Sequence, residues 1–163
     1  MTRWIVTLTA VLLLAGCQDG TWTASGGSDY RTSQLGLIYS PDPNGGAGLR
    51  TMSDSIVPEQ TTENLAIGPA VEFQIGDVAA DLADRVLPGS WVPLQGAPAK
   101  LYGTLALLWQ TRDHGVIFLP GTEVRFFPDN HLQPYMRTEY VKPEGGSAVD
   151  EGLLTTLGAA WQF

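Results

Sequence analysis

A strict alternation of apolar residues with small or polar ones recurs along most of this chain. Between 65 and 75 the odd-numbered residues are all apolar, and the residues between them are Ala, Gly, Glu or Gln. Because successive side chains of a strand point to opposite faces, a period of two predicts a strand with one apolar face. Similar alternation predicts five further strands, at 33–41, 101–111, 116–127, 132–141 and 153–163.

The connections between these segments favour antiparallel pairing of consecutive strands. Two stretches leave alternatives open. Residues 42–63 form either one long loop or a tight turn at 42–46 followed by a weak strand near 47–57. Residues 77–98 hold either a short helix or a strand near 85–94. The sequence thus predicts an all-β, antiparallel up-and-down meander that closes into a small barrel of six to eight strands.

Composition and charge limit the range of folds and partners that the chain can have. The 19 Gly and 11 Pro against 16% charged residues suit short strands joined by turns. A formal net charge of −8 argues against a nucleic-acid partner, because a phosphate backbone would repel the chain. Cys17 is the single cysteine, so no internal disulfide and no cysteine-based metal cluster is predicted.

The first 17 residues have the organisation of an export signal. Arg3 is followed by an apolar run over 5–14, which at about ten residues is too short to span a bilayer. The run ends in Leu-Ala-Gly-Cys at 14–17, which resembles the lipobox of bacterial lipoproteins. The resemblance implies cleavage before Cys17 and attachment of a diacylglycerol and an N-acyl chain to it.

The same resemblance implies a location and partners. Membrane lipid would hold the protein through acylated Cys17, and the lipoprotein sorting machinery would handle it. Gln18 follows the cysteine, which favours the outer membrane over retention in the inner membrane. We expect a signal peptide over 1–16, a lipidated cysteine with a flexible tether over 17–31, and a β-barrel domain over 32–163. The tether is expected because 18–31 is polar, rich in Gly and Ser and without period.

Two kinds of barrel, soluble and membrane-spanning, differ in which face of their strands points inward. A soluble barrel turns its apolar face inward, whereas a membrane barrel turns that face to lipid and keeps small or polar residues inside. Here the polar faces carry mostly Gly, Ala, Thr and Gln, which suits the interior of a narrow barrel and favours the membrane type. The few charges on these faces can neutralise one another, so we predict an interior charge network of Glu72, Glu123, Arg125, Arg137 and Glu139. In so narrow a barrel these residues are expected to form a plug rather than to line a selective channel.

The C-terminus carries a second resemblance. Phe163 ends the chain, and Trp161, Ala159 and Leu157 precede it at alternate positions. This resembles the C-terminal signal of small outer-membrane β-barrel proteins, and it implies that Trp161 and Phe163 are read by the outer-membrane assembly machinery. We expect 153–163 to pair with 132–141 and with the first strand near 33–41. The aromatic residues form either an interface girdle or core packing: Trp91, Trp109, Tyr135, Tyr140, Trp161 and Phe163.

Catalytic signals are weak. His114 and His131 fall in predicted turns at opposite ends of the strands, so they cannot share a metal. No phosphate-binding loop or nucleophile elbow is present, and we predict no enzymatic site, cofactor or metal. The favoured function is an outer-membrane-anchored lipoprotein with a small plugged barrel and a structural or interaction role. The alternatives are a lipid-anchored soluble barrel, lipocalin-like, that binds an apolar ligand, and a lipid-modifying outer-membrane enzyme.

Overall fold

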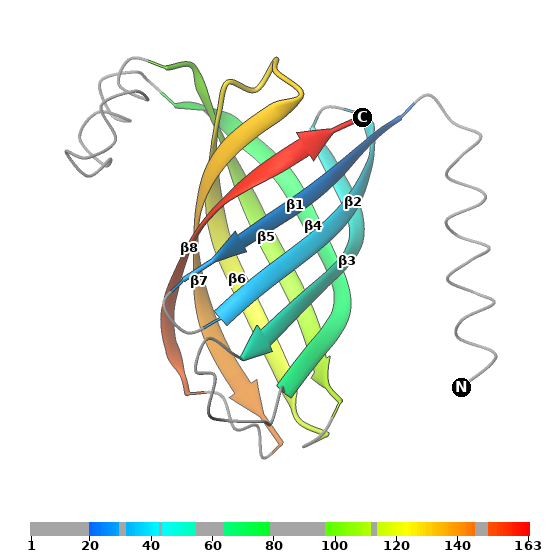
Figure 1. The fold of residues 1–163 in the computed structure, drawn as a ribbon, viewed down its shortest axis with the longest axis vertical. Coiled ribbons are helices and arrows are strands. Elements are labelled where there is room, and N and C mark those ends of the chain that lie inside the picture. Colours follow the sequence, from blue (N-terminus) through cyan, green and yellow to red (C-terminus); the bar gives the residue numbers. More distant parts are fainter. Residues whose placement is uncertain are drawn as a thin grey trace.

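The chain folds into a closed barrel of eight antiparallel strands (Figure 1). The computed structural model describes residues 20–29, 32–42, 44–54, 64–78, 97–111, 114–145 and 150–163. The strands are β1 (Thr21–Ser28), β2 (Thr32–Asp42), β3 (Gly45–Asp54), β4 (Asn64–Val78), β5 (Ala99–Gln110), β6 (Val116–Phe126), β7 (Leu132–Glu144) and β8 (Gly152–Gln162). Each strand pairs with the next, and β8 pairs with β1 to close the barrel. Among the described residues, no helix is long and apolar enough to cross a membrane.

The structure confirms the antiparallel meander, its closure and the six predicted strands. Of the two alternatives left open for 42–63, the structure shows the one with a strand, which is β3. The strand or helix considered within 77–98 falls largely on residues 79–96, which lie outside the described residues, as do the signal segment and Cys17.

The tether prediction is wrong for residues 21–28, which form β1 and pair with both β2 and β8. The barrel therefore begins at Thr21 and not at residue 32. The expected pairing of the last strand with 33–41 is wrong for the same reason, because β1 lies between them. β1 was not predicted because its residues are mostly small and show no alternation of apolar with polar residues. The packing requires such a small residue at Gly27, where a Cβ would lie 2.6 Å from the Tyr135 hydroxyl oxygen and 2.8 Å from the Leu157 carbonyl oxygen.

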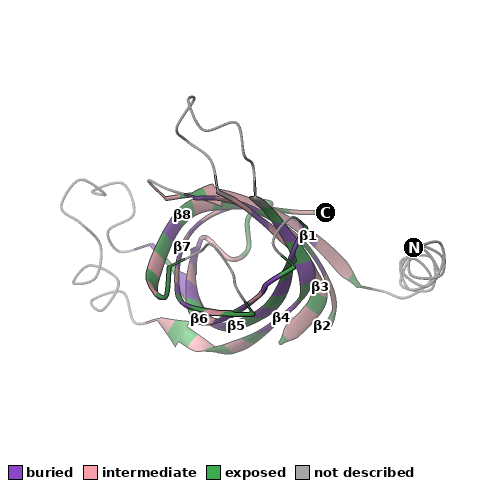
Figure 2. Ribbon diagram, turned by 90° about the horizontal axis from the view of Figure 1, so that it is seen from below, coloured by how far each residue is buried: buried purple, intermediate pink, exposed green. Residues whose placement is uncertain are grey.

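Burial alternates along the strands as a barrel wall requires. On β4, Ile67, Val71 and Phe73 are 41–53% exposed, whereas Ala66 and Ala70 are at most 3% exposed. Seen along its axis, the barrel wall alternates between buried and exposed residues on most strands (Figure 2). The large apolar side chains therefore lie mainly on the outer surface of the barrel.

The two ends of the barrel differ. We call the end at which β1 begins and β8 finishes the terminal end, which is at the top of Figure 1. The opposite end, where β1 leads into β2 and β7 leads into β8, is the distal end. A buried apolar layer fills the interior near the distal end: Met52, Ala66, Leu108, Ile117, Leu119 and Val141. Polar side chains fill the interior toward the terminal end.

Candidate functional site

Six charged side chains lie inside the barrel, each at most 7% exposed. Alternation along the strands directs them inward, with one from β3, one from β4, and two each from β6 and β7. Three are arginines and three are glutamates, so their formal charges cancel: Arg50, Arg125, Arg137, Glu72, Glu123 and Glu139. The structure places all five residues of the predicted network here and adds Arg50.

Glu123 joins the two arginines of the predicted network. It lies opposite Arg137 in the β6–β7 pairing, and it accepts hydrogen bonds from Arg137 Nε at 2.5 Å and from Arg125 Nε. Arg125 also forms an ion pair with Glu72. The Arg125 guanidinium carbon lies 4.5 Å from the centroid of the Tyr102 ring, which adds a cation–π contact.

Arg50 and Glu139 form the other half of the network. Arg50 Nη1 lies 2.6 Å from Glu139 Oε1, and Arg50 Nη2 lies 2.8 Å from Glu139 Oε2, which is the two-point geometry that binds a carboxylate well. The Gln34 side-chain oxygen accepts from Arg50 at 2.5 Å and from Arg137 at 3.3 Å. Gln34 therefore links the two halves into one continuous network across strands β2, β3, β4, β6 and β7.

Arg50 was missed because β3 gives a poor alternating signal. Its inward positions are Gly46, Gly48, Arg50 and Met52, and its outward positions include Thr51 and Ser53, so neither face is consistently apolar. Arg50 and Met52 are two residues apart, so on a strand their side chains point to the same face. Had the strand been predicted firmly, the apolar Met52 would have indicated that Arg50 also points inward.

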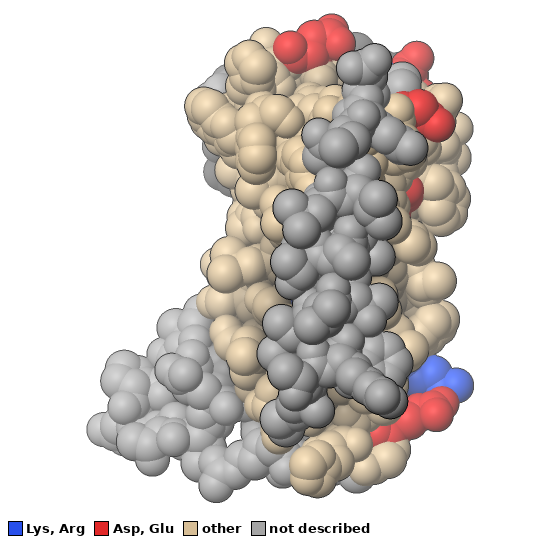
Figure 3. Space-filling view, turned by 90° about the vertical axis from the view of Figure 1, so that its right-hand side faces the viewer, with Lys and Arg blue, Asp and Glu red and all other residues tan. Residues whose placement is uncertain are grey.

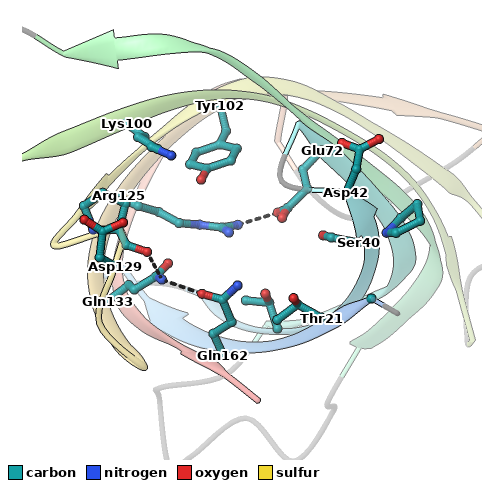
Figure 4. Close-up of a pocket in the computed structure, with 15 residues that line it drawn as sticks. Thr21, Ser40, Asp42, Glu72, Lys100, Tyr102, Arg125, Asp129, Gln133 and Gln162 are labelled. Atoms are coloured by element: carbon teal, nitrogen blue, oxygen red, sulfur yellow. Dashed lines mark hydrogen bonds and ion pairs between the residues drawn. The ribbon is translucent and has the colours of Figure 1, made fainter. Parts of the chain in front are cut away.

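A cavity of about 420 Å³ opens above this network at the terminal end (Figure 4). The Arg125–Glu72 ion pair and Tyr102 belong to its lining, and so do the side chains of Thr21, Ser40, Asp42, Lys100, Asp129, Gln133 and Gln162. Gln133 Nε2 donates to Gln162 Oε1 at 3.0 Å and to the Pro128 carbonyl oxygen at 2.8 Å, which holds the β6–β7 turn against the cavity wall. An apolar ligand would need apolar walls, whereas these walls are polar.

The predicted C-terminal signal residues lie on the outside. Trp161 is 52% exposed, Phe163 is 62% exposed, and the ring of His131 stacks on Trp161 with centroids 6.2 Å apart. Trp22, Tyr39 and Phe73 also lie near the terminal end, with Trp22 opposite Tyr39 in the β1–β2 pairing.

A second group of exposed aromatic residues lies near the distal end: Trp109, Phe118 and Tyr140. Of the aromatics considered for a girdle, Tyr135 instead points inward and is fully buried, and Trp91 lies outside the described residues. Most of these side chains thus lie in two outward-facing groups, one toward each end.

The two histidines lie at opposite ends, as their turns predicted. His114 precedes β6 at the distal end and His131 follows it at the terminal end, with the eleven residues of β6 between them. In the described part of the chain, no three His, Cys, Asp or Glu residues are grouped so as to hold a metal ion. Cys17 lies outside the described residues.

Comparison of the chain with protein-family models, with curated proteins and with solved structures found no match.

Proposed function

We propose that this protein is an outer-membrane lipoprotein whose domain spans the bilayer as a plugged eight-stranded barrel with a structural or interaction role. The observation that carries the proposal is the outer surface. On the described strands, outward positions between the two ends carry no Asp, Glu, Lys or Arg, and they include most of the large exposed apolar residues. Figure 3 shows charged side chains gathered toward the two ends on one face. A surface of this kind suits lipid as its solvent.

The height of the apolar surface supports the same proposal. On β4 the outward apolar residues run from Leu65 to Ile75. Ten residue steps of about 3.3 Å, tilted by about 40° from the barrel axis, give a height of about 25 Å. That is the height of the apolar band of outer-membrane barrels, and groups of aromatic residues lie toward both of its edges here.

The interior supports a closed barrel rather than a channel. A network with no net charge fills the middle of the lumen, and a packed apolar layer lies on its distal side. Buried ions are tolerated when each is paired, and these are. A plugged barrel does not conduct solutes, so its role would be structural, through its membrane anchoring, or one of interaction, through its loops.

The lipid anchor fits the barrel position. Cys17 precedes Thr21 by four residues, so the attachment point of an acyl anchor can lie at most about 14 Å from the start of β1. Acyl chains on Cys17 would therefore enter the leaflet that surrounds the terminal end, which would face the periplasm.

Two measurements test the membrane placement. A Cys17→Ser chain exported by an ordinary signal should remain with outer membranes and migrate differently in detergent gels with and without heating. Release with the soluble periplasmic proteins would overturn the proposal.

A matched pair of substitutions tests the solvent of the outer face. Val71→Lys, at mid-height on β4, should destabilise the barrel in lipid vesicles by about 2–4 kcal/mol, whereas Leu153→Lys, at the distal edge of β8, should cost much less. In a barrel surrounded by water the two would behave alike, because both side chains are already exposed.

A further inference from the structure

We infer that the cavity at the terminal end binds a small amino-acid-like molecule that carries a carboxylate and at least one ammonium group, with basic amino acids preferred. The inference rests on the cavity alone and holds whether lipid or water surrounds the barrel. Its basis is the charged groups that remain at the cavity after the interior network has been satisfied.

Arg125 and Glu72 are not available for a ligand charge. Arg125 is already paired with Glu72 and Glu123, and the network to which they belong is neutral. Three further charged side chains line the cavity: Lys100, Asp42 and Asp129. Their sum is one positive and two negative charges, which a ligand with one carboxylate and two ammonium groups would complement.

Lys100 is the candidate partner of the ligand carboxylate. Its side chain forms no hydrogen bond or ion pair with any other described residue, although Lys100 lies opposite Asp77 in the β4–β5 pairing. Tyr102 lies two residues along the same strand, so both side chains point to the same side of β5. Figure 4 shows the Lys100 amine and the Tyr102 hydroxyl pointing into the cavity next to each other. An ammonium and a hydroxyl donor side by side are suited to a carboxylate.

Asp42 lies on the other side of the cavity, beside Ser40 on β2 (Figure 4). Its Oδ1 accepts a hydrogen bond of 2.6 Å from the Asn44 backbone nitrogen, which fixes the carboxylate at the rim. Asp129 lies on the β6–β7 turn, which the bonds from Gln133 Nε2 hold in place. These two carboxylates are the partners for ammonium groups, and they stand on elements whose position is set by other contacts.

The size of the cavity agrees with this class of ligand. At about 420 Å³ it falls in the range of small-molecule sites, and its walls carry hydroxyl and amide groups that can bind the polar backbone of an amino acid. The buried network beneath the cavity fixes Glu72, Tyr102 and Arg125 before any ligand arrives, so little ordering is required on binding.

Titration calorimetry on the purified full-length protein in detergent micelles tests the inference, with L-lysine, L-alanine, L-glutamate, cadaverine and glucose as probes. Lysine should bind most tightly, alanine less tightly and glutamate most weakly of these three. Cadaverine, which lacks the carboxylate, should bind more weakly than lysine. Lys100→Gln should weaken lysine binding about tenfold and should not weaken cadaverine binding, because the lost partner is that of the carboxylate. Asp42→Asn should weaken both.

Lys142→Gln is the control, because Lys142 lies at the distal end and is paired with Glu144 on the surface. It should leave binding of both probes unchanged. Cadaverine binding as tightly as lysine would show that the acidic rim only attracts cations, and it would overturn the inference. Absence of lysine binding, or equal binding of glucose, would also overturn it. Outer-membrane location is measured separately by heat-modifiable migration, so failure of either proposal is recognised independently.

Discussion

Trp22 and Phe163 exchange two backbone hydrogen bonds, each of 2.9 Å. The C-terminal residue thus pairs with the second residue of β1, at the seam where the barrel closes. Trp22 lies only five residues after Cys17, so the expected anchor, the first strand and the C-terminus meet at one place. A closing seam matters because an unpaired strand edge is not tolerated within a bilayer.

Deletion of Phe163 should sharply reduce the amount of folded protein in the outer membrane. It removes a pair of seam hydrogen bonds and the terminal aromatic of the expected assembly signal. The measurement is the heat-modifiable fraction in isolated outer membranes. Leu153→Ala, which trims a 78% exposed side chain at the other end of β8, is the control and should assemble normally. Equal yields of the deletion and the wild type would show that no assembly signal is read at this end.

Replacement of Arg137 by Ala should destabilise the barrel by about 3–5 kcal/mol, because it removes one of the two arginines that bind the buried Glu123 carboxylate. Urea unfolding in lipid vesicles measures the change. Lys142→Ala on the same strand removes an exposed partner of Glu144 and should have little effect. If the two variants unfold at the same urea concentration, the interior network does not stabilise the fold.

Arg50 and Glu139 should behave as a coupled pair. Arg50→Met leaves Glu139 without its arginine partner and should be strongly destabilising. Adding Glu139→Leu should restore much of the lost stability, because it removes the unpaired charge as well. A double-mutant cycle of unfolding free energies gives the coupling, and additive effects of the two changes would contradict the expectation.

Gly27 and Gly26 provide a test of the interior packing. Gly27→Ala should be clearly destabilising, because its Cβ would collide with the Tyr135 hydroxyl and the Leu157 carbonyl oxygen. Gly26→Ala points outward, where the nearest atom is a Leu35 methyl carbon at 3.4 Å, and should be tolerated. Both variants replace a glycine of β1 by alanine, so the effect of that replacement on the backbone cancels when their unfolding midpoints are compared. Similar midpoints would mean that β1 is not held against Tyr135.

The mature N-terminus should be a lipid-modified Cys17. Mass spectrometry of the N-terminal peptide from the purified protein decides this, because three acyl chains add a large and characteristic mass. A free thiol at Cys17, or cleavage at another bond, would refute the lipoprotein assignment.

Most of the strands could be predicted from sequence because large apolar side chains mark one face of each. β1 could not, since its residues are nearly all small and give no contrast between faces. The charge network was predicted in part: parity alone puts Glu123 and Arg125 on the same face, but Arg50 depends on a strand with a weak pattern. The cavity was not predicted, because its lining comes from all eight strands and a turn, and no local sequence pattern specifies their relative register.

The inward charges also act as a check on strand alignment during folding. A shift of one strand by a single residue reverses which of its side chains face the lumen. For β3, β4, β6 or β7 such a slip would expel an arginine or a glutamate onto the outer wall and leave its former partner alone inside. Misalignment of any of these four strands therefore costs far more free energy than the loss of a few backbone hydrogen bonds alone would cost. β1 and β8 contribute no member to this network, so their alignment has to be secured by shape, as where Gly27 fits beneath Tyr135.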